Sequence, residues 1–269
     1  MARETETVER GSGDADNVLI RECETVEEFD ACVRLQREVF KMPDLELSPR
    51  RHLIVSRLAG GWILGARRAS DGELVGFVHH LVAVRGAEEV IGYSHMMAVA
   101  AAYQNRGLGA RLKWAQRERA LAEGRRFIRW TFEPMQARNA HFNLNRLGVS
   151  VRSYGVNFYG WDAGTEATTA DGEQFNLDSD RLIAEWELAS PRVEACARGE
   201  RDARNATPAV ATVEIPAEWN ALRRADGRAA QSELLRVRTE FQTHFAAGLV
   251  CAGFERDPER PRYLFYRDE

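Results

Sequence analysis

The chain has 269 residues, of which 44% are hydrophobic and 29% charged, and its 37 basic and 41 acidic side chains leave a formal net charge of −4. A chain of this length can bury a substantial core, as one large domain or two small ones. The near-balance of charge does not predict binding to nucleic acid or to a membrane surface, and no run approaches the roughly 20 apolar residues of a membrane span.

The cysteines and the first residues point to an ordinary cytoplasmic protein. Cys23, Cys32, Cys196 and Cys251 form no CxxC pair, which argues against a zinc knuckle or a thioredoxin-like site, and we expect them to be reduced. Residues 1–17 are polar and acidic, and they lack the apolar stretch of a secretory signal. We expect them to form a disordered tail.

Capping and turn residues divide the first part of the chain. Thr25 and Glu28 have the spacing of a capping box, which predicts the start of a helix that Pro43 stops. Ser48-Pro49 predicts a second helix start, with proline at the first helical position. Apolar runs separated by turn residues then predict a meander of strands. The expected elements are a strand over 18–21, helices over 25–43 and 48–60, and strands over 62–66, 74–84 and 90–99.

The remaining elements follow from the same signals. They are a helix over 108–123, a strand over 127–132, a helix over 137–147, a β-like segment over 149–161, a polar loop over 162–178, a strand over 181–188, a charged irregular stretch over 191–208, a strand over 212–215, a helix over 229–247, and a hairpin of strands over 249–254 and 263–266. The order of elements predicts an α/β protein.

The sharpest local feature is the segment Gln104-Asn105-Arg106-Gly107-Leu108-Gly109-Ala110, between a predicted strand and a predicted helix. Backbone N–H groups at a helix N-terminus favour an anion such as a pyrophosphate, and glycines let the backbone approach it. A dinucleotide fingerprint would need glycine at Leu112, and the Gly-Lys-Ser/Thr of a P-loop is also missing. A Gly-x-Gly pair alone is most simply a tight turn without a ligand.

In its context, the segment resembles the signature of the GNAT acyltransferase superfamily, Gln/Arg-x-x-Gly-x-Gly/Ala after the fourth strand. Gln104, Gly107 and Gly109 fit it, and the strand over 95–99 lies just upstream. The resemblance covers roughly residues 18–161. It implies the GNAT fold, a mixed and mostly antiparallel sheet with flanking helices. Residues 162–269 are then expected to form a C-terminal α/β extension with polar linkers.

The resemblance also implies a cosubstrate, which is acetyl-CoA or another acyl-CoA, and no metal. The pantetheine arm would pair with the backbone of Met97, Ala98 and Val99, and the 104–110 segment would hold the pyrophosphate. Asn139 is one of three asparagines in the 137–147 helix that are candidates for contacts with pantetheine or substrate amides. Capping and solvent contact explain at least one of them more simply.

Acyl transfer to an amine requires a base, because an alkyl amine is mostly protonated at neutral pH. His95 is the first candidate, since its unperturbed pKa suits proton transfer and a histidine at this strand position serves as the base in the arylalkylamine branch of the family. A histidine packed in a sheet is an equally good explanation. Glu133 is the second candidate, although a surface carboxylate explains it more simply. Adjacent His79 and His80 point to opposite faces of a strand and cannot chelate one metal.

The general acid is the point of departure from the family. Counting back from Gly148, Leu144 stands where the family often has a tyrosine, and Tyr154 or Tyr159 would have to replace it. We expect an acyl-CoA-dependent N-acyltransferase acting on a small amine or a peptide amine. The alternatives are other thioester chemistry, such as decarboxylation, and a non-catalytic acyl-CoA sensor. A homodimer is expected only as the commonest assembly.

Overall fold

The computed structural model describes residues 17–160, 166–169, 171–200 and 207–268, which form two compact units that divide between residues 125 and 126. The predicted tail lies outside this range except for Asn17, and the predicted domain boundary after residue 161 also falls outside it. That boundary stays a prediction. No helix in the described ranges is both long and apolar enough to cross a membrane.

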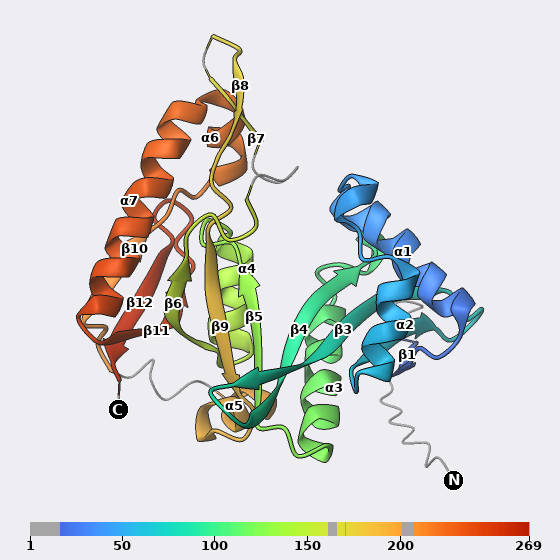
Figure 1. The fold of residues 1–269 in the computed structure, drawn as a ribbon. Helices are drawn as coiled ribbons and strands as arrows, with labels where there is room; N and C mark the ends of the chain where they lie inside the picture. The colour runs from blue at the N-terminus through green and yellow to red at the C-terminus, as the bar shows by residue number, and fades with distance from the viewer. Residues whose placement is uncertain (1–16, 161–165, 170, 201–206, 269) are drawn as a thin grey trace. The chain divides into compact units, whose positions relative to one another are not determined.

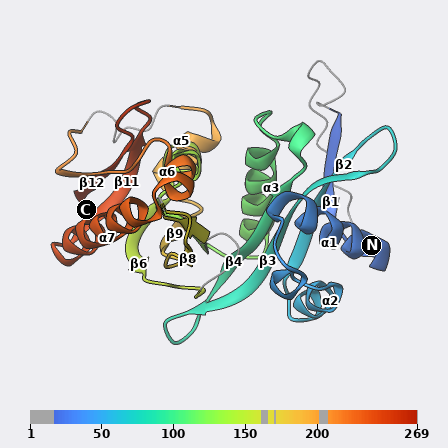
Figure 2. The ribbon, with the colours of Figure 1, turned by 90° about the horizontal axis from the view of Figure 1, so that it is seen from above.

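The first unit has antiparallel strands in the order β1-β2-β3-β4, with helices on both faces (Figure 1). Seen from above in Figure 2, α1 and α2 lie on one side of β3 and β4, and α3 lies on the other. The elements are β1 (Val18–Glu22), α1 (Val26–Phe40), a 3-10 turn (Asp44–Glu46), α2 (Arg50–Leu58), β2 (Trp62–Arg68), β3 (Leu74–Arg85), β4 (Glu89–Val99), a 3-10 turn (Ala101–Tyr103) and α3 (Leu108–Ala122).

The helix starts in this unit follow the local sequence closely. The Thr25 side chain accepts the N–H of Glu28, and the Glu28 carboxylate accepts the N–H of Thr25, so the predicted capping box is confirmed. The prediction for Pro49 was wrong by one position. Its ψ of 158° is extended, so it is the N-cap of α2 and Arg50 is the first helical residue.

The sequence of α3 predicts an apolar face made of Leu108, Leu112, Ala115 and Ala122. The buried face differs from it, because Ala115 is only half-buried and Ala122 is exposed. The buried side chains instead include polar ones that form a network under the sheet. Lys113 Nζ donates to Ser94 Oγ at 2.7 Å and to Gln116 Oε1 at 3.1 Å. The buried set on α3 is Leu108, Leu112, Lys113, Gln116, Arg117 and Ala120.

Adjacent histidines of β3 reach the two faces of the sheet, as predicted. His79 Nε2 lies 2.7 Å from Ser56 Oγ of α2, whereas the His80 ring stacks on Trp62 with centroids 4.0 Å apart on the α3 side. Both residues are fully buried. Burial lowers the pKa of each imidazole to about 3, with nearby positive charge adding to the effect.

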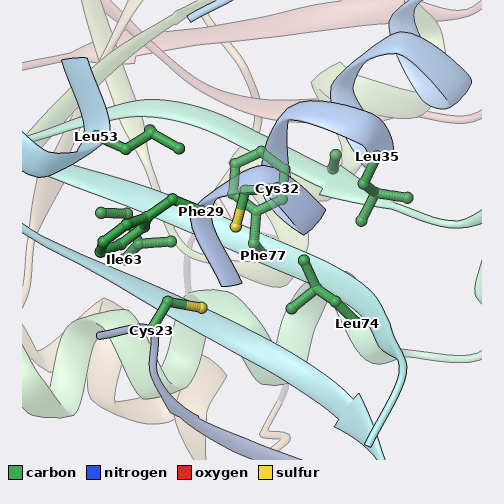
Figure 3. Close-up of a cluster of buried hydrophobic side chains, with 9 residues drawn as sticks. Cys23, Phe29, Cys32, Leu35, Leu53, Ile63, Leu74 and Phe77 are labelled. Atoms are coloured by element: carbon green, nitrogen blue, oxygen red, sulfur yellow. The ribbon is translucent and has the colours of Figure 1, made fainter. Parts of the chain in front are cut away.

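The core between the sheet and the helices α1 and α2 is a cluster of buried side chains (Figure 3). Phe29, Cys32 and Leu35 of α1 meet Ile63 and Phe77 of the sheet, and Leu53 of α2 closes the cluster. Cys23 and Cys32 are free thiols in it. This cluster holds both helices on the face of β4 that carries Ala98.

The second unit has antiparallel strands in the order β5-β9-β6-β11-β12-β10 and a separate β7-β8 hairpin. Phe241 of α7 packs against Tyr154, Tyr263 and Phe265, so α7 covers one face. The elements are β5 (Phe127–Phe132), α4 (Ala137–His141), a π-helix (Phe142–Arg146), β6 (Ser150–Gly155), β7 (Glu166–Thr168), β8 (Gln174–Asn176), β9 (Arg181–Glu187), α5 (Pro191–Ala197), β10 (Ala211–Glu214), α6 (Trp219–Ala225), α7 (Gly227–Ala246), β11 (Leu249–Glu255) and β12 (Arg262–Arg267).

Two expectations for this unit were wrong, and one helix was missed. The polar loop contains the β7-β8 hairpin, and the charged stretch begins with α5, whose N-cap Ser190 accepts the N–H of Val193 and precedes a proline. The Ser190-Pro191 pair is a helix start signal, but the charged composition of the following residues favours an irregular segment. The helix α6 was not predicted. Antiparallel pairing and flanking helices nevertheless confirm the expected α/β fold class.

We predict that Leu53→Ala lowers the free energy of unfolding by about 2–5 kcal/mol, because Leu53 is 0% exposed and its truncation leaves a cavity. The matched control is Leu58→Ala in the same helix, where the side chain is 84% exposed and a change within about 0.5 kcal/mol is expected. Urea unfolding monitored by circular dichroism gives both values. Equal losses in the two variants would contradict the packing shown in Figure 3.

We also predict that acid destabilises the fold through the histidines of β3. An unfolded histidine takes up a proton near pH 6.5, whereas folded His79 does so only at about pH 3. The unfolded state therefore binds more protons between these values, and stability is lost as the pH falls from 6.5 towards 3. Between pH 7 and pH 5 this loss is about 2 kcal/mol for one such histidine.

The test is His79→Gln, with urea unfolding measured at pH 7, 6 and 5. Between pH 7 and pH 5, the free energy of unfolding of the variant is expected to fall by about 2 kcal/mol less than that of the wild type. This difference does not depend on the stability of the variant at pH 7. A pH dependence as steep as that of the wild type would show that His79 is not the titrating group.

Candidate functional site

A β-bulge in β4 decides where His95 points. The pairing of β3 with β4 shifts there, so that His79 faces Met96, His80 faces Ser94, and His95 has no opposite partner. Met97 lies on the α3 face, where it neighbours Gly109, and strict alternation would place His95 on that face too. The extra residue rotates His95 to the α2 face, which is what bulges commonly do beside functional sites.

Ser48 contacts His95 and is itself held by a buried glutamine, two roles that the sequence patterns do not predict. Ser48 Oγ lies 2.9 Å from His95 Nε2. Ser48 is held by the fully buried Gln36, whose Oε1 accepts the N–H of Ser48 at 2.9 Å and whose Nε2 donates to its carbonyl at 3.3 Å. In the sequence, the Ser-Pro pair indicates only a helix start. The chain separation of 47 residues between Ser48 and His95 leaves no local signal for the contact.

Three imidazoles gather on this face of the sheet. The rings of His52, His79 and His95 lie edge to face, with centroids 5.4 to 5.5 Å apart. His95 keeps accessible surface, but partial desolvation of its ring lowers its pKa, and the charge of His52 lowers it further. His95 is therefore neutral at pH 7 and able to accept a proton. Within the described ranges, no three His, Cys, Asp or Glu side chains are arranged to hold a metal ion.

The 104–110 segment connects β4 to α3 through two left-handed residues. Gln104 Nε2 donates to the carbonyl of Val99 at 2.9 Å, which ties the segment to the end of β4. Asn105 has φ 61° and Gly107 has φ 82°. Gly107 is the N-cap of α3, and the first intrahelical bond runs from the Arg111 N–H to its carbonyl. The N–H groups of residues 108–110 therefore precede that bond at the open end of the helix.

The glycines leave room for an anion at this helix end. A Cβ at Gly107 would meet nothing within 4 Å, and one at Gly109 would only touch Met97 at 3.6 Å. Arg106 is exposed beside them. Arg111 has another role, because its guanidinium donates to the carbonyl of Val18 at 2.7 Å and fastens α3 to β1. The segment thus fits a phosphate-bearing ligand such as acyl-CoA.

The end of β4 presents the backbone that the resemblance assigned to pantetheine. Met97, Ala98 and Val99 pair with Val78, Phe77 and Gly76 of β3 through one edge of the strand. Ala98 is buried in the core of the α1 face. Their assignment to pantetheine stays a prediction.

In the second unit, Glu133 follows β5 directly and is half-buried. Its Oε1 accepts the Trp219 Nε1–H at 2.9 Å, and its Oε2 accepts from Gln136 at 3.2 Å. Asn139 is exposed in α4. Asn145 is structural, because its amide makes two hydrogen bonds of 2.9 Å with the backbone of Phe254 in β11.

Tyr154 and Tyr159, the two candidates for the general acid, differ in their surroundings. Leu144 is fully buried in the π-helix. Burial raises the pKa of Tyr154 well above its usual range, and its hydroxyl donates to Asp180 at 2.7 Å, so Tyr154 is poorly suited to release a proton. Tyr159 is exposed, and its hydroxyl lies 2.8 Å from Thr131 Oγ1 of β5.

Several solved structures of acetyltransferases are similar to part of the chain. Among solved structures, a putative GNAT acetyltransferase from Desulfovibrio desulfuricans covers 64% of this chain and 99% of its own, with 19% identity and a TM-score of 0.50. The ribosomal-protein-S18-alanine N-acetyltransferase from Escherichia coli covers 64% and 95%, with 16% identity and a TM-score of 0.48. An Elizabethkingia anophelis GNAT acetyltransferase with acetyl-CoA bound covers 64% and 99%, with 16% identity and a TM-score of 0.45.

Likeness at these identities concerns the fold alone, and no curated protein matches the chain. The model of the acetyltransferase (GNAT) family matches residues 26–148. This range runs from the start of α1 through β4, the 104–110 segment and α3 to the end of the π-helix. The chain therefore carries an acetyltransferase domain of the GNAT family over residues 26–148.

Proposed function

We propose that this protein is an acyl-CoA-dependent N-acyltransferase, with acetyl-CoA as its donor and a small amine or a peptide amine as its acceptor. The observation that carries the proposal is the open N-terminus of α3, capped by the left-handed Gly107 and tied to β4 by Gln104. Acetyl-CoA supplies the acyl group as a thioester. The N–H groups of residues 108–110, Arg106 and the α3 dipole bind its pyrophosphate.

His95 takes the proton of the acceptor amine in this proposal. This role requires the tautomer in which Nε2–H donates to Ser48 Oγ, because Nδ1 is then unprotonated and takes the proton. A neutral amine then attacks the thioester carbonyl, and a backbone N–H in Met97 to Val99 stabilises the oxyanion. The thiolate leaves readily, because a thiol has a pKa of about 8.5. Of the two tyrosines, we assign the return of a proton to Tyr159, because it is exposed whereas the Tyr154 hydroxyl donates to Asp180.

A second candidate is a non-catalytic acyl-CoA sensor. The observation that favours it is Leu144, which occupies the usual tyrosine position with a side chain that is fully buried and cannot donate a proton. Ligand binding alone does not separate the two functions, whereas formation of an acylated amine does.

We predict that Gly107→Ala abolishes most of the thermal stabilisation by acetyl-CoA, because a Cβ at this position occupies the space of the phosphates. The matched control is Gly124→Ala, which also has a positive φ, 78° against 82°, and open space around its Cβ. In both variants, alanine in the left-handed conformation lowers the free energy of unfolding by about 1–2 kcal/mol. At 100 times its Kd, acetyl-CoA stabilises a binding-competent protein by about 2.7 kcal/mol, a rise of several degrees in Tm.

Only the Gly124→Ala variant and the wild type are expected to show that rise. An equal rise in the Gly107→Ala variant would remove the α3 N-terminus from the proposed binding site.

We predict that His95→Ala lowers kcat about 10²–10⁴-fold while acetyl-CoA binding, measured by thermal shift, is unchanged. In the wild type, kcat/KM should fall only below the ordinary histidine pKa of about 6.5, because the pKa of His95 is lowered and the neutral base persists to lower pH. Release of free CoA in the presence of amines measures the kcat of the variant and the pH dependence of kcat/KM in the wild type. Unchanged turnover in the variant would exclude His95 as the base.

A further inference from the structure

The contact between Ser48 and His95 has the geometry of a nucleophile and its base. Ser48 Oγ lies 2.9 Å from His95 Nε2, a distance at which a hydroxyl can pass its proton to an imidazole. Within the part of the chain that the structure describes, the Ser48 hydroxyl has no other hydrogen-bond partner. An imidazole with its own proton on Nδ1 therefore offers Nε2 as the acceptor for the hydroxyl proton.

A second serine–histidine contact on the same face of the sheet lacks these properties. Ser56 Oγ lies 2.7 Å from His79 Nε2, but its hydroxyl donates to the carbonyl of Leu53 at 2.9 Å, so its only proton is already engaged. Ser56 is 4% exposed and His79 0%, which closes this pair to a ligand. In the other pair His95 is exposed, so a ligand can reach it.

The surroundings of Ser48 suit a nucleophile held in a fixed position. The fully buried Gln36 bonds both the N–H and the carbonyl of Ser48. Helix α2 begins two residues later, and the N–H groups of Arg50 and Arg51 precede its first intrahelical bonds, which go to the Pro49 carbonyl. Donors at an open helix end can stabilise the negative charge of a tetrahedral intermediate.

We propose that Ser48 is a nucleophile that takes the acyl group from the thioester and passes it to water, so that the protein also hydrolyses acyl-CoA. The inference goes beyond the proposed function and rests on its acyl-CoA binding. Ser48 Oγ attacks the carbonyl, and its proton passes to His95 Nε2. The carbonyl–sulfur bond breaks, and the thiolate leaves with that proton. Water then attacks the ester, its proton passes through His95 to Ser48 Oγ, and the carboxylic acid is released.

The two tautomers of His95 serve the two reactions. With Nε2 protonated, Nδ1 accepts the proton of an amine, and with Nδ1 protonated, Nε2 accepts the proton of Ser48. His95 is therefore needed for both reactions, whereas Ser48 forms a covalent bond to the acyl group only in hydrolysis.

The first test is the release of CoA from acetyl-CoA by the full-length protein without any amine. Ser48→Ala and His95→Ala are each expected to lower this rate at least about 100-fold, and the double variant is expected to lose no more, because nucleophile and base act as a unit. Ser56→Ala is the matched control, since it removes a serine that also contacts a histidine, and it is expected to keep the wild-type rate. Equal losses in Ser48→Ala and Ser56→Ala would overturn the proposal.

Trapping the acyl-enzyme distinguishes a nucleophile from a serine that only orients His95. After an acid quench of the reaction with acetyl-CoA, peptide mass spectrometry is expected to find an acetyl group on Ser48 and none on Ser56. A fluorophosphonate, which phosphonylates activated serines with loss of fluoride, is expected to label Ser48 without any need for CoA binding. Hydrolysis with neither adduct would assign the reaction to water activated by His95 and overturn the role of Ser48.

These readouts separate the inference from the proposed function. Acetylation of small amines or peptide amines, with neither hydrolysis nor a Ser48 adduct, would overturn the inference and keep the function. A Ser48 adduct and hydrolysis without any acetylated amine would support the inference and overturn the N-acyltransferase. Absence of acetyl-CoA binding in the thermal-shift measurement would overturn both.

Discussion

One extra residue in β4 is the constraint on which the candidate site depends. Without the bulge, the side chain of His95 would lie on the α3 face of the sheet, away from the face that carries Ser48. With it, His95 reaches Ser48 while Ser94 takes the opposite face and binds Lys113. The bulge thus supplies a neutral imidazole to one face of the sheet and a polar partner to the other.

The two faces of this sheet are stabilised in different ways. On the α1 and α2 face, an apolar cluster positions the helices, and Gln36 then fixes Ser48 through its backbone. On the α3 face, buried polar groups satisfy one another through Lys113, Gln116 and His80. A buried polar network of this kind tolerates little displacement. It therefore keeps α3, and with it the open helix end at residues 108–110, in register with β4.

The second unit positions its polar groups through residues that are distant in the chain. Arg238 of α7 pairs with Asp178 and Asp180, and Trp219 of α6 orients Glu133 at the end of β5. These contacts make α6 and α7 part of the surroundings of a GNAT-domain residue. A segment that the family model does not match thereby orients a carboxylate within the matched range.

Local signals in the sequence determined the α/β class, the capping box at Thr25, the β5 bounds and the glycine segment before α3, because each depends on residues a few positions apart. The family resemblance followed from the same short range. The bulge at His95, the contacts of Ser48 and Gln36, and the position of β9 between β5 and β6 were decided only by tertiary structure. A bulge shifts the strand register without a sequence mark of its own, and contacts across 47 or 86 residues depend on packing that no local pattern encodes.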